Sequence, residues 1–188
     1  MRKTKFIFML VFPLLLIFSI GGLCQATMIQ WRIEDGGNGH WYERIDTLMT
    51  WNDAEIYAES LGGYLATVTS KAENDFLWNA FVQDGPTFCM LGGFQPPGTP
   101  EPDTGWQWVT GEEWKYTNWG IGQPDDAHGG QDYLSFWYDN TWDDNYLNNV
   151  NFPSIVEVPE PATLLLLGFG GLALRLRSGQ ALRRKRRA

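Results

Sequence analysis

Two groups of oxygen-bearing side chains stand out in the second half of the chain. The first is Gln123-Pro124-Asp125-Asp126 and the second is Asp143-Asp144, with Gln131-Asp132 between them. Carboxylate and amide oxygens are the ligands that Ca²⁺ prefers, and the ion takes about six to eight of them from several segments. The spacing therefore favours a cation site that is built from separate loops.

The charge of the chain is divided into three zones. Ten of the 14 basic residues lie within residues 2–5 and 175–187, and all 22 acidic residues lie between these ends beside only four basic ones. The middle zone thus carries a net charge of −18. A segment this acidic is a poor partner for nucleic acid or an anionic membrane surface. We expect no nucleic-acid partner, and the charge itself is compatible with a cation site or with solubility alone.

The N-terminus has the order of a secretory signal. Basic residues precede an apolar run from Phe6 to Ile20, and small residues follow near Ala26. We predict a signal peptide over residues 1–26 that is removed near Ala26, with a retained membrane anchor as the alternative. Cleavage there would remove Cys24 and leave Cys89 as the single cysteine, so that no internal disulfide could form.

The C-terminus, residues 158–188, contains three ordered pieces. Pro159-Glu160-Pro161 is followed by an apolar run over residues 162–174 and then by the basic tail. Thirteen helical residues rise about 20 Å, less than the ~30 Å of a bilayer's hydrocarbon core. This order resembles the PEP-CTERM sorting signal of Gram-negative bacteria. The resemblance implies export to the cell surface or extracellular matrix, transient inner-membrane insertion of 162–174 and an exosortase-type processing enzyme; an ordinary tail anchor is the alternative.

Residues 28–158 have the length of one domain. Helical periodicity covers residues 51–61 and 71–81, after the N-cap residues Thr50 and Ser70, and Glu73 would complete a capping box with Ser70. Strand patterns cover residues 40–45, 64–68, 89–94, 106–109, 133–138, 154–158 and a stretch from 142. This order predicts an α+β fold in which two long loops, 95–105 and 120–130, carry the function.

The predicted domain resembles the C-type lectin-like family over residues 39–158. The matching pieces are Trp51-Asn52-Asp53-Ala54-Glu55, residues 61–68, Leu91-Gly92-Gly93, residues 106–111, Tyr116-Thr117-Asn118-Trp119, Gln123-Pro124-Asp125 and Trp142-Asp143-Asp144. The resemblance implies two helices packed on small antiparallel sheets, with a long ligand-binding loop region.

The resemblance also implies a calcium site. Gln131 stands where the family has Glu and Asp143 where it has Asn, so three negative ligands remain. The implied Ca²⁺ ligands are Gln123, Asp125, Gln131, Asp143 and Asp144. The first four of these would also bind the sugar. The candidates for a second metal ion are Asp103, Asp126 and Asp132.

In this family two adjacent sugar hydroxyls join the ligands of the calcium ion. Gln-Pro-Asp implies a galactose-type preference, and Glu-Pro-Asn implies a mannose type. Galactose binders usually carry an aromatic residue after the motif, but Asp126-Ala127 and then His128 follow here. Trp137 and Tyr138 are the other candidates for stacking on a sugar. Most tryptophans are expected in the core, including Trp51, Trp106, Trp119 and Trp142.

The family's usual disulfides are missing, because Ala58, Tyr133 and Val156 stand at cysteine positions. We expect Cys89 to be a buried apolar residue.

The remaining patterns argue against an enzyme. The sequence has no Ser-His-Asp order, no zinc-ligand spacing and no phosphate-binding loop. Its carboxylate pairs alone do not exclude a glycosidase, but the loop motifs account for these acids. Two functions remain: a calcium-dependent carbohydrate-binding module, whose ligand could be an exopolysaccharide, and a calcium-independent module for protein interaction or surface structure.

Overall fold

The computed structural model describes residues 28–85, 88–146 and 151–160. The predicted signal peptide (1–26), Pro161, the apolar run 162–174 and the basic tail lie outside the described residues. Within the described ranges, no helix is long and apolar enough to cross a membrane.

Two α-helices begin at the predicted caps. Thr50 precedes α1 (Trp51–Ser60) and accepts the Asp53 N–H, and Ser70 precedes α2 (Lys71–Leu77) and accepts the Glu73 N–H. The prediction of an α-helix up to residue 81 is corrected, since a π-helix, η2 (Trp78–Val82), replaces its last turn. The capping box is also incomplete: the Glu73 carboxylate accepts the Thr69 N–H at 2.8 Å rather than that of Ser70.

The strands form one mixed sheet in the order β1-β2-β8-β4-β6-β7, with β3 beside β8 and β5 beside β4. They are β1 (Ile29–Gln30), β2 (Trp41–Met49), β3 (Tyr64–Leu65), β4 (Cys89–Phe94), β5 (Gln107–Trp108), β6 (Tyr133–Phe136), β7 (Trp142–Asn145) and β8 (Phe152–Val158). Two short 3₁₀ turns complete the fold, η1 (Ile33–Asp35) and η3 (Tyr138–Asn140). The expected small antiparallel sheets are joined into one because Met90 of β4 pairs with Ser154 of β8 in parallel.

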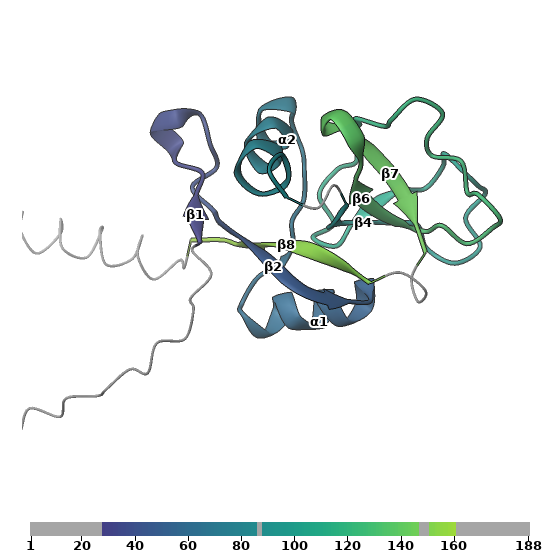
Figure 1. Cartoon of the computed structure of the whole chain (residues 1–188), viewed down its shortest axis with the longest axis horizontal. Coiled ribbons are helices and arrows are strands. Elements are labelled where there is room, and N and C mark those ends of the chain that lie inside the picture. Colours follow the sequence, from purple (N-terminus) through teal and green to yellow (C-terminus); the bar gives the residue numbers. More distant parts are fainter. Residues whose placement is uncertain (1–27, 86–87, 147–150, 161–188) are drawn as a thin grey trace, which may run out of the picture.

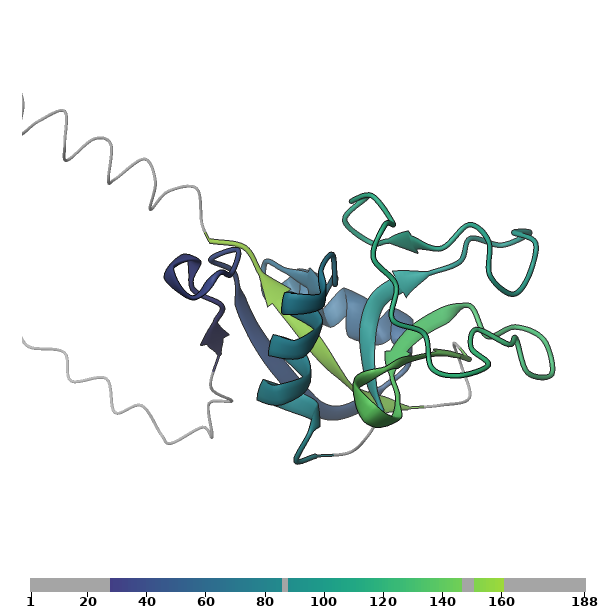
Figure 2. The same ribbon diagram turned by 90° about the horizontal axis from the view of Figure 1, so that it is seen from above.

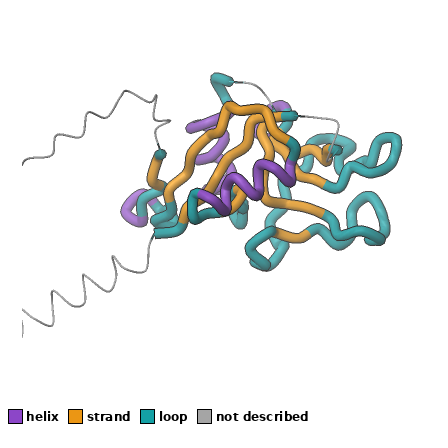
Figure 3. The backbone as a smooth tube through the Cα atoms, turned by 90° about the horizontal axis from the view of Figure 1, so that it is seen from below, coloured by secondary structure: helices purple, strands orange, loops and turns teal. Residues whose placement is uncertain are grey.

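The elements are arranged so that the chain ends and the long loops lie apart. Helices α1 and α2 lie on opposite sides of the β2/β8 pair (Figure 1). Strand β1 and the end of β8 mark one end of the domain, where the described chain begins and stops (Figure 1). The long loops gather at the other end, beyond β4, β6 and β7 (Figures 2 and 3). A ligand at the loops would therefore be held away from the chain ends.

The three residues at the expected cysteine positions lie in apolar surroundings. Ala58 and Val156 are fully buried in one cluster with Ile45, and Tyr133 packs against Trp51 with ring centroids 4.7 Å apart. Cys89 is free and buried, as predicted, and burial raises the pKa of its thiol to about 12. The tryptophan prediction is also confirmed, because Trp51, Trp106 and Trp142 are buried and Trp119 packs against the main core.

Candidate metal centre

The loop of residues 120–130 begins and ends beside β7. Its first residue, Gly120, donates its N–H to the Trp142 carbonyl at 2.8 Å, and Trp142 donates to the Asn118 carbonyl at 2.9 Å. The loop then returns into β6, where Leu134 pairs with Asp144 of β7. The fully buried Trp142 thus fixes one end of the loop, and the β6–β7 ladder fixes the other.

Asp144 connects this loop to the sheet. Its side chain is fully buried, and its carboxylate accepts the N–H groups of Asp125 at 3.1 Å and Asp126 at 2.7 Å. Its carbonyl accepts the Gln131 side-chain amide at 2.8 Å. The Asp126 carboxylate in turn accepts the Gln131 N–H at 3.0 Å. Four of the predicted site residues are therefore brought together by hydrogen bonds that run through one aspartate.

Two amide oxygens at this centre are buried without a hydrogen-bond donor: Oε1 of Gln123 and Oε1 of Gln131. Gln123 precedes Pro124 across a cis peptide bond. A buried carbonyl that lacks a partner costs about 1–3 kcal/mol. An amide oxygen is a ligand that hard cations such as Ca²⁺ prefer, so these two atoms suit a metal ion.

The carboxylates of the centre are crowded. Asp143 is 9% exposed, and burial, then the charges of Asp144 and Asp125, raises its pKa to about 6. Burial also raises the pKa of Asp144, against the opposing effect of the amides that it accepts. Among the described residues, no lysine, arginine or histidine forms an ion pair with these aspartates. A bound cation would relieve both the burial cost and the mutual repulsion.

The donor set therefore fits a hard cation, on one condition. In the described ranges, no group of three or more His, Cys, Asp or Glu side chains is placed to hold a metal ion by itself. The amide oxygens of Gln123 and Gln131 must consequently contribute.

The second group of acids differs in part from the prediction. Burial and then the charges of Asp126 and Asp132 raise the pKa of Glu101. Beside them lies the buried Gln95, whose Oε1 has no hydrogen-bond partner. Asp103 is exposed and makes none of these contacts. The sequence prediction named Asp103 and not Glu101, since two acids of one loop differ only in where the backbone directs them.

The candidates for sugar stacking are placed differently from one another. Trp137 is partly buried, and a Cβ on Gly120 would lie 2.5 Å from its ring, so it supports the start of the loop. Tyr138 is 54% exposed, and Ile121 is fully exposed two residues before Gln123. His128 is exposed and in the left-handed region with φ 69°. The Tyr146 hydroxyl donates to the Ala127 carbonyl and ties the loop to the end of β7.

The chain is similar to known proteins in sequence and in fold. The family model for the lectin C-type domain matches residues 47–152. Human C-type lectin domain family 10 member A is 28% identical over 134 residues, which cover 68% of this chain and 38% of that protein. The chain thus spans well under half of that relative's length.

Solved structures show the same fold at low identity. The cow C-type carbohydrate-recognition domain of CD23, solved in the presence of an oligosaccharide, has a TM-score of 0.57 at 20% identity and covers 65% of this chain and 89% of that one. A calcium-independent type II antifreeze protein has a TM-score of 0.59 at 21% identity, with coverage of 73% and 95%.

We predict that Asp143→Asn stabilises the metal-free protein at pH 7.5. Because the folded pKa of Asp143 lies above its ordinary value of 3.8, its contribution to stability is present at low pH and is lost as the pH rises towards 6. Removing the charge should raise the free energy of unfolding by about 1–2 kcal/mol at pH 7.5 and change little at pH 4. Thermal unfolding in a chelator measures this, with the exposed Asp84→Asn as control. An equal stability of wild type and variant at pH 7.5 would contradict it.

Proposed function

Since the chain belongs to the lectin C-type domain family, which binds ligands and does not catalyse reactions, we propose that it is a calcium-dependent carbohydrate-binding module. The observation that carries this proposal is the pair of donor-free buried amide oxygens, Gln123 Oε1 and Gln131 Oε1, at a centre with two buried aspartates. A divalent cation would bind the two amide oxygens and balance the charge of the two aspartates without a basic side chain.

The five residues Gln123, Asp125, Gln131, Asp143 and Asp144 would hold Ca²⁺. When bound, the ion supplies coordination positions for two adjacent hydroxyls of a sugar. Asp125 is exposed, so its carboxylate can accept a hydrogen bond from a sugar hydroxyl. Gln123 and Gln131 each keep an amide group that can donate to a hydroxyl oxygen. Asp144 keeps Asp125 and Asp126 in place through their backbone amides.

The order Gln123-Pro124-Asp125 favours a galactose-type pair of hydroxyls, by the resemblance described above. No aromatic residue follows this motif; the large hydrophobic side chain that is exposed on the loop is Ile121. We propose that the sugar is held chiefly through its hydroxyls, with little stacking. An exopolysaccharide that presents such hydroxyls is a suitable ligand.

A second cation would need the unpartnered oxygen of Gln95 together with Asp126, Asp132 and Glu101, because these three carboxylates are not placed to hold an ion by themselves. Asp126 also accepts the Gln131 N–H. A cation at this group would therefore stiffen the same loop that carries Gln123 and Asp125.

We further propose that the chain is exported and sorted. The supporting features are the signal-like residues 1–26 and the order Pro159-Glu160-Pro161, apolar run 162–174 and basic tail. They suggest a Gram-negative cell surface or matrix, transient inner-membrane insertion and processing by an exosortase-type enzyme. The intact mass of the protein recovered from its producing cells tests this, because a mass that retains both ends would contradict it.

One observation favours a second function, a calcium-independent interaction module. The Asp144 carboxylate is already satisfied by two backbone amides, and its carbonyl by the Gln131 amide. The loop is thus held without an ion. The calcium-independent antifreeze protein with the same fold is a precedent for such a state.

We predict that the double variant Gln123→Glu, Asp125→Asn changes the sugar preference. Wild type should be retained on a galactose surface in millimolar calcium and released by chelator. The variant should lose galactose retention at least ~10-fold and gain mannose retention, because the acceptor and donor order of the motif is reversed. Glu59→Ala, on the exposed side of α1, should behave as wild type. Unchanged preference in the double variant would refute the role of the motif.

The second-ion proposal predicts different results at two acids of one loop. Glu101→Gln should remove or weaken one of two calcium-binding events, since it removes a carboxylate that faces Asp126 and Asp132. Asp103→Asn, outside this group, should leave both unchanged. Calcium titration followed by isothermal calorimetry gives the stoichiometry. A loss in Asp103→Asn with none in Glu101→Gln would reverse the assignment.

A further inference from the structure

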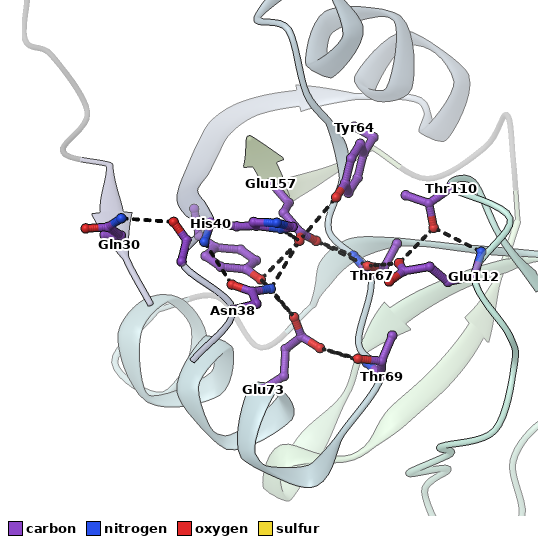
Figure 4. Close-up of polar contacts among 12 residues, drawn as sticks. Gln30, Asn38, His40, Tyr64, Thr67, Thr69, Glu73, Thr110, Glu112 and Glu157 are labelled. Atoms are coloured by element: carbon purple, nitrogen blue, oxygen red, sulfur yellow. Dashed lines mark hydrogen bonds and ion pairs between the residues drawn. The ribbon is translucent and has the colours of Figure 1, made fainter. Parts of the chain in front are cut away.

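A second polar centre lies at the end of the domain where the described chain begins and stops (Figure 4). Two carboxylates there are almost completely buried: Glu73 of α2 is 2% exposed and Glu157 of β8 is 1% exposed. Both approach the hydroxyl of the buried Tyr42, at 2.8 Å for Glu73 Oε1 and 3.1 Å for Glu157 Oε1. One phenolic proton can serve only one of them at a time, so the pair requires further compensation.

Backbone amides and side chains supply part of this compensation. Glu157 Oε2 accepts the Thr67 N–H at 3.0 Å, and Glu73 Oε2 accepts the Thr69 N–H at 2.8 Å. Asn38 donates to the Tyr42 hydroxyl at 2.7 Å and to Glu73 at 3.2 Å. These donors are all neutral, so they leave the net charge of two buried carboxylates unbalanced.

His40 is the group that can balance it. Its Nδ1 lies 2.6 Å from Glu157 Oε1, and its side chain is 29% exposed. The titratable groups that face it are Glu157, Glu73 and Glu112, with the Tyr42 and Tyr64 hydroxyls around Glu157. In the described ranges, no lysine or arginine forms an ion pair with these glutamates. The hydrogen bond to Glu157, then the charges of the glutamates, raises the pKa of His40 above 6.5 against the opposing effect of burial.

The same histidine belongs to a segment that folds back over this centre. His40 and Trp31 are joined through the Trp31 N–H and the His40 carbonyl at 3.0 Å, and Trp31 stacks on Phe76 of α2. Gln30 donates both to the Gly39 carbonyl and to Glu160, which follows β8. Residues 30–40 thus connect the incoming chain, the buried carboxylates and the outgoing chain.

We propose that protonated His40 is a latch that holds residues 30–40 over the buried Glu73–Glu157 pair, and that the latch opens as the histidine loses its proton with rising pH. A histidine whose pKa is raised on folding contributes stability below its unfolded value and loses it as the pH passes the folded value. Glu73, whose pKa is raised chiefly by burial, acts in the same direction. The histidine is therefore isolated by comparing the wild type with a variant that changes His40 alone.

The test compares the full chain with His40→Asn between pH 6.5 and 9 in excess chelator. Asparagine keeps a donor near the Nδ1 position but no titratable charge. The wild-type melting temperature should fall by ~2–5 °C more than that of the variant across this range. The chain has two histidines, and the other one offers the matched control. His128→Asn should keep the wild-type dependence of the melting temperature on pH. Equal slopes in wild type and His40→Asn would overturn the latch.

Hydrogen exchange of the wild type gives a second, local measurement if the variant fails to fold. After correction for the intrinsic pH dependence, the Trp31 and Gly39 amides should exchange at least ~10-fold faster at pH 8.5 than at pH 6.5. The Gly120 amide, at the other end of the domain, should show no such change. Constant protection of Trp31 and Gly39 would overturn the latch, whatever the calcium titration shows.

Discussion

The loop end of the domain depends on the hydrogen bonds that the fully buried carboxylate of Asp144 accepts from the loop. Asp144 lies on a strand that is fixed by Trp142 and by the β6–β7 ladder, and it accepts two consecutive amides from the loop that follows Pro124. A long loop with four residues in the left-handed region near its tip, Asp126, His128, Gly129 and Gly130, has few backbone partners of its own. Asp144 accepts the amides of Asp125, Asp126 and Gln131 and thereby holds these residues in place.

The domain buries carboxylates at both ends and compensates them in different ways. At the loop end, Asp143 and Asp144 have backbone amides beside them but no basic side chain among the described residues, and two amide oxygens have no donor. At the other end, Glu73 and Glu157 have hydroxyls, amides and the His40 imidazole. Unpaired buried charge is costly. The loop end therefore favours a bound metal ion, and the other end favours the protonated imidazole of His40.

Helix caps and strand patterns predicted most of the elements of the fold, because each depends only on residues that are close in sequence. Thr50 and Ser70 cap helices whatever lies beyond them, and strand β4 matches its pattern over residues 89–94. Glu101 and Glu157 were not anticipated as parts of polar groups. Residues 153–157 of β8 are all buried, and the strand sequence does not reveal that Glu157 points into a closed centre, since that depends on α2 and on residues 38–42 far away in sequence. The single mixed sheet likewise depends on a pairing between residues 90 and 154.

The most direct test of the calcium-binding account is a calorimetric titration of calcium into the full chain, with wild type beside Asp144→Asn. Asparagine keeps an oxygen for the Asp125 and Asp126 amides but removes the charge. The account predicts binding by wild type with a dissociation constant in the range of about 10⁻⁴–10⁻³ M that is typical of extracellular sites, and binding at least ~10-fold weaker in the variant. No binding by wild type, or equal binding by both, would contradict the account and leave a calcium-independent interaction module.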